Sequence, residues 1–381
     1  MRAWRAGLLN ELDCIINHPE GLGGDIPGRS AFEEPGIGAF HRSLPGRAPT
    51  PLIEAAGIAA ELGLGKVYIK DEARRCDVKA FKILGASWAV HRLLREEPGI
   101  ATFATATDGN HGMALATAAR LHARRAVVFM PRGTAKARVE RIRATGAVVE
   151  VLEVDYDETV RHAAATAERE GWTLVQDTAW PGYEVVPAMI QAGYLTLFRE
   201  VAEQLGAFGG DPGIDLVLLP VGVGSLAAAG VWFHHHSYGD RRPRLVAVEP
   251  RNAGCLAASL AAGEPRSVAA PGTLMAGLNC GTVSSIAWPL LRDGLDGALL
   301  LDDDAVPPAM RRYANLEPAV VSGESGAAGL AALTELLTST ALEPLRRHLR
   351  LRPDSRALVL NTEGDTDPAT YRRLVEGVFE G

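Results

Sequence analysis

One lysine of this sequence has neighbours that could make its amine reactive. Lys82 lies in the apolar run Ala-Phe-Lys-Ile-Leu-Gly, and a buried ammonium is unfavourable unless it has a partner or loses its proton. If Lys82 begins the helix after a strand, burial and the positive helix end both lower the pKa of its amine and favour the neutral nucleophile that forms a Schiff base. The alternative is a lysine whose stem packs while its ammonium reaches water. Lys79, three residues earlier, is expected to be a solvated or phosphate-side charge without a role in the chemistry.

A second candidate is the turn Asp108-Gly109-Asn110 in the stretch TATDGNHGMALA, between an apolar strand pattern and an alanine-rich helix pattern. Asp and Asn are common in turns and helix caps, so simple capping is one explanation. In the functional interpretation, Asn110 hydrogen-bonds a ligand and Asp108 acts in its proton chemistry.

A third candidate is a glycine-rich turn in LLPVGVGSLAAAG, where an apolar strand is followed by Gly222, Val223, Gly224 and Ser225 and then by a helix. Glycines at a helix N-terminus leave backbone N–H groups accessible, which is the arrangement that binds phosphate. The stretch has neither GxGxxG nor GK[ST], so it does not indicate a nucleotide. An ordinary glycine turn remains the alternative.

Two more polar clusters follow apolar runs. QDTAWPGYEVVP places Asp177, Trp180, Tyr183 and Glu184 after one strand pattern, and the alternative here is a turn with a packed tryptophan. LVLNTEGDTDP places Thr362 and three carboxylates after another, and these side chains could cap a helix, hold a cation or line a pocket.

No metal site is predicted. The consecutive residues His234, His235 and His236 point about 100° apart on a helix, so a solvated face is expected instead. Cys280 is expected to be a packed thiol, since no base stands near it in the sequence. The four cysteines are far apart without CxxC spacing, which favours free thiols.

The elements that must position these residues follow an α/β pattern. Short β-branched or apolar runs alternate with alanine-rich amphipathic stretches, which indicates mainly parallel sheets with both faces covered. The predicted strands are residues 66–72, 101–106, 125–131, 148–154, 173–177, 215–221, 244–250, 297–303 and 357–363. The predicted helices include residues 111–122, 135–146, 158–170 and 326–337. The Gly- and Pro-rich segment 23–52 is expected to be a long surface lead-in.

Composition narrows the class of protein. The 381 residues carry 39 Lys and Arg against 46 Asp and Glu, a net charge of −7, so nothing indicates nucleic acid or an anionic membrane as a partner. No stretch approaches the roughly 18 apolar residues of a membrane span. The N-terminus lacks a sustained apolar region, so no signal peptide is predicted and a cytoplasmic location is expected.

Taken together and in this order, Lys82, Asn110, the glycine loop and the late Thr362 resemble the fold-type II pyridoxal 5′-phosphate enzymes, the group of tryptophan synthase β and threonine dehydratase. The resemblance extends from Pro49 or Pro51 to the TEGDTDP segment. Within the group, KAFKILGAS, ATDGNHG, QDTAWPGYEVVP, MAGLNCG, SGESGA and NTEGDTDP are similar to diaminopropionate ammonia-lyases.

The resemblance implies an α,β-elimination that converts 2,3-diaminopropionate into pyruvate and two ammonia molecules. A serine or threonine dehydratase, or another β-eliminating amino-acid lyase on the same scaffold, stays open. So does a catalytically silent binding protein, although such a protein has no need of an amine in an apolar run.

The resemblance also implies the architecture: two open, mainly parallel, twisted sheets flanked by helices, with pyridoxal phosphate in the cleft between two domains. The large domain is expected to comprise residues 1–86 and 197–381, and a small inserted α/β domain residues 87–196. A homodimer that binds a small amino-acid substrate is typical of the group.

Roles for individual residues follow from the resemblance alone. Lys82 matches the lysine that forms the Schiff base and, once free, removes the α-proton of the L-substrate. Asp108 matches the base on the opposite face, which would admit the D-isomer, and Asn110 matches the partner of the cofactor's phenolic oxygen. Asp177 matches a carboxylate at the substrate end, where a distal ammonium needs a counter-charge.

The remaining implied contacts are those of the cofactor's two ends. Gly222, Val223, Gly224 and Ser225 match the loop that binds the phosphate through backbone N–H groups. Thr362 matches the neutral hydroxyl that contacts the pyridine nitrogen.

Overall fold

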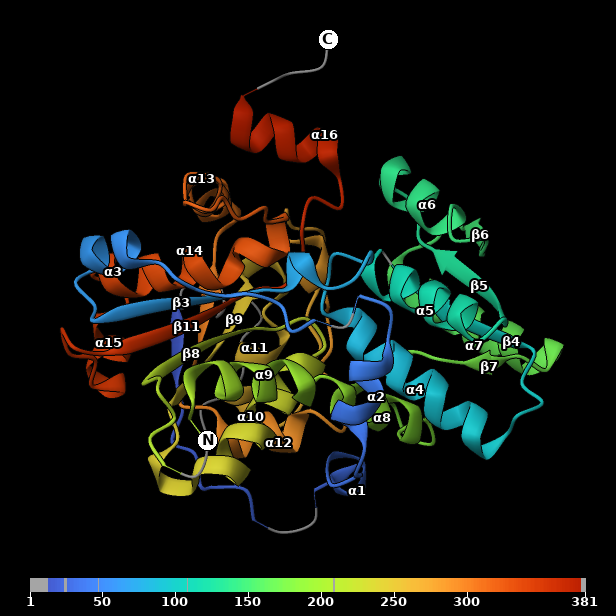
Figure 1. Ribbon diagram of the computed structural model, residues 1–381, viewed down its shortest axis with the longest axis horizontal. Helices are drawn as coiled ribbons and strands as arrows, with labels where there is room; N and C mark the ends of the chain where they lie inside the picture. The colour runs from blue at the N-terminus through green and yellow to red at the C-terminus, as the bar shows by residue number, and fades with distance from the viewer. Residues whose placement is uncertain (1–12, 24–25, 47, 108, 208–209, 378–381) are drawn as a thin grey trace.

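The computed structural model describes residues 13–23, 26–46, 48–107, 109–207 and 210–377. Its strands form two separate sheets with helices packed against them (Figure 1). The seven-stranded sheet has the order β1-β10-β9-β8-β11-β3-β2, and the four-stranded sheet has the order β6-β5-β4-β7. This arrangement confirms the predicted α/β class.

The five central strands of the larger sheet are parallel, and the short strands β1 and β2 pair antiparallel at its two edges. The sheet consists of β1 (Cys14–Ile16), β2 (Leu52–Glu54), β3 (Lys66–Asp71), β8 (Leu216–Pro220), β9 (Arg244–Pro250), β10 (Gly297–Leu301) and β11 (Arg356–Asn361). Strands β8 and β10 are buried along their whole length, as expected for a parallel sheet covered on both faces.

The smaller sheet is parallel throughout and consists of β4 (Thr102–Ala106), β5 (Arg125–Met130), β6 (Val148–Val151) and β7 (Thr173–Leu174). Alternate residues of its strands face opposite sides, because side chains alternate along a strand. Ala104 and Phe129 pack with Ala163 of α7 (Tyr156–Glu170), while Phe103 and Val128 belong to the core shared with α4 (Lys82–Glu96) and α5 (Asn110–Leu121). Helices therefore cover both faces (Figure 1).

The other helices complete the layers. They are α1 (Arg29–Phe32), α2 (Ile37–Ser43), α3 (Ala56–Leu62), α6 (Lys136–Arg143), α8 (Val185–Gly193), α9 (Leu195–Leu205), α10 (Ser225–Tyr238), α11 (Cys255–Ala262), α12 (Trp288–Gly294), α13 (Val306–Ala314), α14 (Glu324–Thr338), α15 (Glu343–Leu349) and α16 (Pro368–Tyr371). All four smaller-sheet strands lie within residues 87–196, and the exact domain boundaries remain a proposal.

All nine predicted strands are present, but β1 and β2 were not predicted. Each has three residues, too few to show an alternating pattern. The expectation for residues 23–52 was wrong in part. The segment contains α1 and α2, and Phe32 and Ile37 are buried in the core, because single apolar residues between the Gly and Pro turns point inward.

Two glycines let α4 and α8 approach each other closely. A Cβ on Gly193 would lie 2.5 Å from the carbonyl oxygen of Leu84, and one on Gly85 would lie 2.8 Å from that of Ile190. Such distances exclude a side chain at either position. The first turn of α4, which carries Lys82, is thereby fixed against α8.

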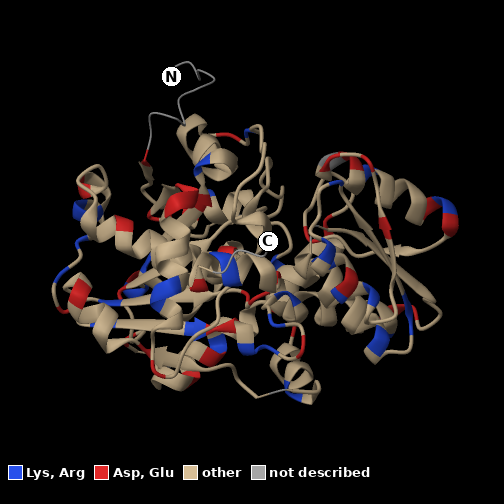
Figure 2. Ribbon diagram, turned by 90° about the horizontal axis from the view of Figure 1, so that it is seen from above, with Lys and Arg blue, Asp and Glu red and all other residues tan. Residues whose placement is uncertain are grey.

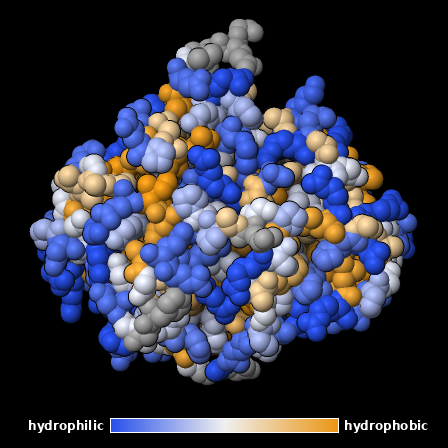
Figure 3. All heavy atoms as spheres, in the orientation of Figure 1, coloured by the Kyte–Doolittle hydropathy of each residue, from blue (hydrophilic) through white to orange (hydrophobic). Residues whose placement is uncertain are grey.

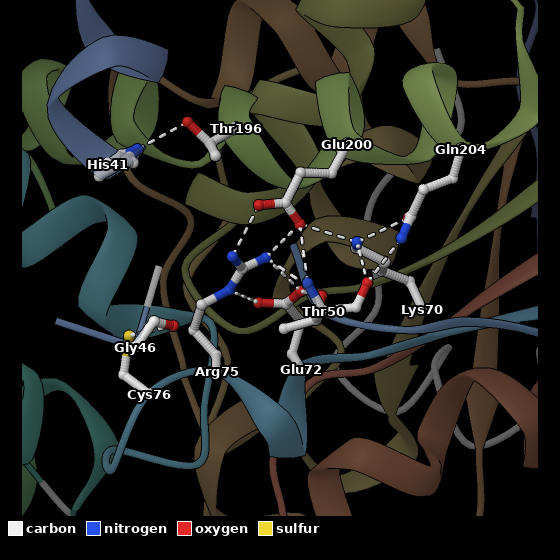
Figure 4. A network of polar contacts seen from close by, with 10 residues as sticks. All are labelled: His41, Gly46, Thr50, Lys70, Glu72, Arg75, Cys76, Thr196, Glu200 and Gln204. Atoms are coloured by element: carbon white, nitrogen blue, oxygen red, sulfur yellow. Dashed lines mark hydrogen bonds and ion pairs between the residues drawn. The ribbon is translucent and has the colours of Figure 1, made fainter. Parts of the chain in front are cut away.

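A buried network of charges holds the segment just before Lys82 (Figure 4). Arg75 donates to Glu200 at 2.7 Å and to Glu72 at 2.8 Å, and Lys70 lies 2.8 Å from Glu200. Two cations therefore face two carboxylates, and Lys70 also donates to the carbonyl oxygen of Thr50 at 2.8 Å. Because each buried charge has partners, the network ties the end of β3 to α9 without leaving a charge unpaired.

Acidic and basic residues are interspersed across the molecule (Figure 2), and hydrophilic side chains cover most of the face drawn in Figure 3. Among the helices of the described residues, none is long and apolar enough to cross a bilayer.

Candidate active site

The ends of parallel strands bring the predicted site residues to one cavity. Its lining includes Lys82, Asn110, Asp177, Gly222, Val223, Gly224, Ser225 and Thr362. Each of these residues follows a strand or starts the helix after it, which is where α/β sheets form their sites. Asp108 lies outside the described residues.

Lys82 is the first residue of α4, and its ammonium faces a carboxylate. The distance from Lys82 Nζ to Asp177 Oδ2 is 2.5 Å, and the two side chains are 18% and 7% exposed. Burial is the largest single influence on the pKa of Lys82 and lowers it. The charge and hydrogen bond of Asp177 and the nearby Tyr194 and Cys280 together raise this pKa by more, so the net direction is upward. The expectation of a lowered pKa was therefore wrong, because the sequence pattern does not show that Lys82 pairs with a carboxylate 95 positions away.

Asp177 is held on both its side chain and its backbone. Burial is the largest single influence on the pKa of its carboxyl and raises it, but the Lys82 ammonium, the His111 ring and the hydrogen bonds to the carboxylate together outweigh burial and lower that pKa to about 2. The hydroxyl of Ser225 donates to the Asp177 carbonyl oxygen at 2.8 Å. Lys82 and Asp177 thus form a charged pair, and Ser225 at the start of α10 holds the backbone of Asp177.

Asn110 begins α5, as the sequence predicted within one residue, and its side-chain amide donates to Glu363 Oε2. The other oxygen of Glu363 accepts the backbone N–H of Ser325 at 3.1 Å. Thr362 is buried, and its carbonyl oxygen accepts the N–H of Phe81 at 3.2 Å. The end of β11 is therefore connected to the starts of α4, α5 and α14.

In the glycine loop between β8 and α10, neighbouring atoms leave little room for a side chain at Gly222 and Gly224. Gly224 has φ 97°, and a Cβ there would lie 2.7 Å from Leu291 Cδ1. A Cβ on Gly222 would lie 3.2 Å from both Cys280 Sγ and the Gly277 carbonyl oxygen. The first turn of a helix leaves N–H groups without intrahelical partners, so this loop and α10 offer a phosphate-binding surface to the cavity.

The cavity also contains side chains to which sequence reasoning gave no role in the chemistry, among them His111, Arg138, Tyr156, Cys280, Ser325 and Glu363. His111 directly follows Asn110, and its position in the sequence predicted only the start of a helix. The DGNH spacing was the available signal, because residues in the first turn after a strand face the same edge of the sheet. Arg138 of α6 lies 4.0 Å from Glu324 of α14.

The histidine triplet differs from its prediction. His234 is 2% exposed and packs against Phe198, Phe233 and Tyr238, so the expected solvated face was wrong at that position. Within the described ranges, no cluster of His, Cys, Asp or Glu side chains has the geometry of a metal site.

These residues fit pyridoxal phosphate. Lys82 supplies an amine for its carbonyl carbon, and the loop from Gly222 to Ser225 offers the backbone N–H groups of a helix start to its phosphate. Asn110 and Thr362 line the same cavity and add a neutral amide and a neutral hydroxyl. Each requirement of the group therefore has a counterpart in one cavity.

Comparisons of sequence agree with this arrangement. Residues 44–359 match the model of the family described as pyridoxal-phosphate dependent enzyme. The chain is 38% identical over 365 residues to a diaminopropionate ammonia-lyase of Salmonella typhimurium, covering 88% of this chain and 90% of the relative. Identity to the biosynthetic L-threonine dehydratase of the same organism is 28% over 288 residues, which span 76% of this chain and 52% of the relative.

Comparisons of structure give the same grouping. The diaminopropionate ammonia-lyase of Escherichia coli, crystallised with an aminoacrylate-PLP azomethine intermediate, superposes with a TM-score of 0.87 at 35% identity, covering 96% of this chain and 98% of that one. A maize serine racemase gives 0.72 at 25% identity, with coverage of 88% and 94%. The chain thus belongs to the pyridoxal-phosphate dependent enzymes, and within them it groups with the diaminopropionate ammonia-lyases.

Proposed function

We propose that the protein catalyses the pyridoxal-phosphate-dependent α,β-elimination of 2,3-diaminopropionate to pyruvate and two ammonia molecules. The observation that carries the proposal is the pair of Lys82 and Asp177, an amine and a buried carboxylate 2.5 Å apart at the cofactor end of one cavity. The identity of 38% to a diaminopropionate ammonia-lyase supports the choice of substrate.

The roles proposed for the site residues follow from their positions in the cavity. The N–H groups of the loop from Gly222 to Ser225 hold the phosphate, and Asn110 and Thr362 orient the ring. Bound pyridoxal phosphate supplies the electron sink for the charge that develops at Cα. Lys82 holds the cofactor through its amine and removes the α-proton from the L-substrate, and Asp108 serves the D-substrate from the other face.

Asp177 gives the site its preference for a diamine. The second ammonium of the substrate needs a buried counter-charge, and Asp177 offers one when Lys82 no longer occupies it. The β-nitrogen must depart with its proton retained, and a carboxylate beside it holds that proton in place. A neutral hydroxyl, as in serine or threonine, offers Asp177 no ion pair, so the diamine gains a charged contact that these substrates lack.

Turnover measurements test the substrate directly. Both enantiomers of 2,3-diaminopropionate are compared with serine and threonine, and pyruvate and ammonia are counted in each reaction. The proposal expects two ammonia molecules per pyruvate and preference for the diamine. Faster release of pyruvate from serine, with one ammonia molecule each, would instead support the serine or threonine dehydratase function.

The assembly is part of the same proposal. Residues 87–196 are proposed to close on the large domain, 1–86 and 197–381, and so exclude water from the cleft. A cytoplasmic homodimer is expected from the family resemblance. Light scattering during size-exclusion chromatography measures the mass in solution, and a monomer would contradict the dimer.

A further inference from the structure

The carboxylate of Asp177 faces two basic nitrogens. Its Oδ2 atom lies 2.5 Å from Lys82 Nζ and 3.9 Å from His111 Nδ1. Within the described residues, these are the ion-pair contacts of Asp177 out to 4.0 Å. His111 is 4% exposed, so its ring is as well sealed from water as the carboxylate that it faces.

The other ring nitrogen of His111 fixes the tautomer. His111 Nε2 lies 2.8 Å from the carbonyl oxygen of Val175, and a carbonyl can only accept. Nε2 therefore carries the hydrogen, and in the neutral ring Nδ1 presents a lone pair. Val175 and Asp177 belong to the same short segment, so this segment faces both ring nitrogens of His111.

Nδ1 of His111 has no hydrogen-bond partner in the part of the chain that the structure describes. A buried polar atom without a partner calls for an explanation, and a role in proton chemistry is one of those known. Since Nδ1 faces Asp177, the state to consider is one in which Nδ1 carries a proton.

The chemistry of Lys82 creates that state. Its ammonium must lose a proton before the amine can bond to a carbonyl carbon. When it does, the charge that balances Asp177 disappears, and a buried carboxylate without a counter-charge is strongly unfavourable. His111 is placed to supply the missing charge.

We infer that His111 accepts the proton that Lys82 gives up, by way of Asp177. The proton leaves Nζ for Oδ2 of Asp177, and Asp177 passes a proton to Nδ1 of His111. Before the transfer the three groups are ammonium, carboxylate and neutral imidazole; afterwards they are neutral amine, carboxylate and imidazolium. The total charge is unchanged and no proton enters the solvent. Because His111 acts on Lys82 through Asp177, it is a positioning residue for the protonation of Lys82.

The surrounding charges favour this alternation. Burial lowers the pKa of His111 and so does the Lys82 ammonium, while Asp177 raises it, so the ring is neutral while Lys82 is charged. Loss of the Lys82 charge removes one lowering influence and keeps the raising one. Tyr194 and Cys280 are the other titratable groups that act on Lys82, and burial raises the pKa of the Tyr194 phenol, which keeps its proton at neutral pH.

The inference rests on the proposed function, because it assumes that Lys82 reacts with a carbonyl cofactor. It is tested on the cofactor-free protein, so the two can fail separately. Competitive labelling with acetic anhydride measures the neutral fraction of Lys82 as a function of pH, with the modified peptide quantified by mass spectrometry. Internal transfer predicts that labelling of Lys82 in the wild type changes little with pH around neutrality.

His111→Gln removes the proton acceptor and keeps an amide that can donate to Val175. In this variant the neutral amine arises only by loss of a proton to solvent, so labelling should fall about tenfold or more at pH 7 and rise about tenfold for each pH unit. The matched control is His41→Gln. His41 is equally buried, but its ring nitrogens already have partners, Thr196 at 2.6 Å and the Leu84 carbonyl oxygen at 2.9 Å. Equal pH dependence of Lys82 labelling in wild type and His111→Gln would overturn the inference.

A second measurement leaves His111 in place and so does not depend on the folding of that variant. Lys82→Met deprives Asp177 of its ammonium, and His111 should then carry protons on both nitrogens at pH 7. Nitrogen-15 NMR of the imidazole distinguishes this state from the neutral ring expected in the wild type. A His111 that remains neutral in Lys82→Met would also overturn the inference, whether or not the enzyme binds pyridoxal phosphate.

Discussion

Replacing Asp177 with Asn removes the counter-charge of Lys82 and keeps the size of the side chain. The pair has a 2.5 Å contact, with side chains 18% and 7% exposed, so solvent screens it only weakly. Breaking a buried pair of this kind costs about 3–5 kcal/mol. Since the pKa of Lys82 is raised by Asp177, this change lowers it and increases the neutral amine by roughly a hundredfold to a few thousandfold at a given pH.

The variant should therefore change two properties in opposite directions. Lys82 of the cofactor-free protein should be labelled faster by acetic anhydride at pH 7. Turnover of 2,3-diaminopropionate by the loaded enzyme should fall by about a hundredfold or more, because the site has lost its counter-charge for the second ammonium.

Asp365→Asn is the matched control for this experiment. Asp365 pairs with Lys79 at 3.0 Å, but the lysine is 51% exposed, and an exposed pair contributes at most about 1 kcal/mol. Both readouts should stay near those of the wild type. The reasoning is refuted if Asp177→Asn leaves the labelling of Lys82 unchanged or if it retains full turnover of the diamine.

Three further predictions concern residues in the cavity lining or next to it. Burial raises the pKa of Glu324 from its ordinary value of 4.5 to about 7, so the folded state binds that proton more tightly. The unfolding free energy should therefore fall by about 3 kcal/mol as pH rises from 4.5 to 7. Glu324→Gln should flatten this fall in urea unfolding, and an unchanged pH dependence would argue against it. Gly224→Ala should lower the unfolding free energy by about 1–3 kcal/mol, because φ is 97° at this position and the new methyl group would contact a side chain. An unaltered melting midpoint in calorimetry would contradict this prediction. Glu363→Ala should weaken the binding of pyridoxal phosphate, because the Asn110 amide and the Ser325 N–H lose their acceptor. A wild-type dissociation constant in an absorbance titration would contradict this prediction.

The sequence was sufficient for the architecture around the site because the relevant signals are local. Strand β8 is apolar throughout, and β11 is apolar between Arg356 and Asn361. The Gly-rich and polar residues that follow these strands mark where each chain segment leaves the sheet. Parallel strands end at the same edge, so Gly222 and Thr362, 140 positions apart, reach one cavity. No packing detail was needed for that conclusion.

The electrostatics of the site could not be predicted in the same way. The state of Lys82 depends on Asp177, and the neighbourhood of the two is set by how α4 packs beside the end of β7. A lysine in an apolar run is compatible with either a neutral amine or a paired ammonium. The same limit applies to His234, whose burial depends on contact with Phe198 of the neighbouring helix α9.

The most direct test of the central claim is the location of the covalent bond. The protein is incubated with pyridoxal phosphate, reduced with borohydride and digested, and the peptides are sequenced by mass spectrometry. The phosphopyridoxyl group should be found on Lys82, with none on the neighbouring Lys79. A modification at Lys79, or a protein that acquires no phosphopyridoxyl group, would contradict the assignment of Lys82 as the cofactor-binding amine.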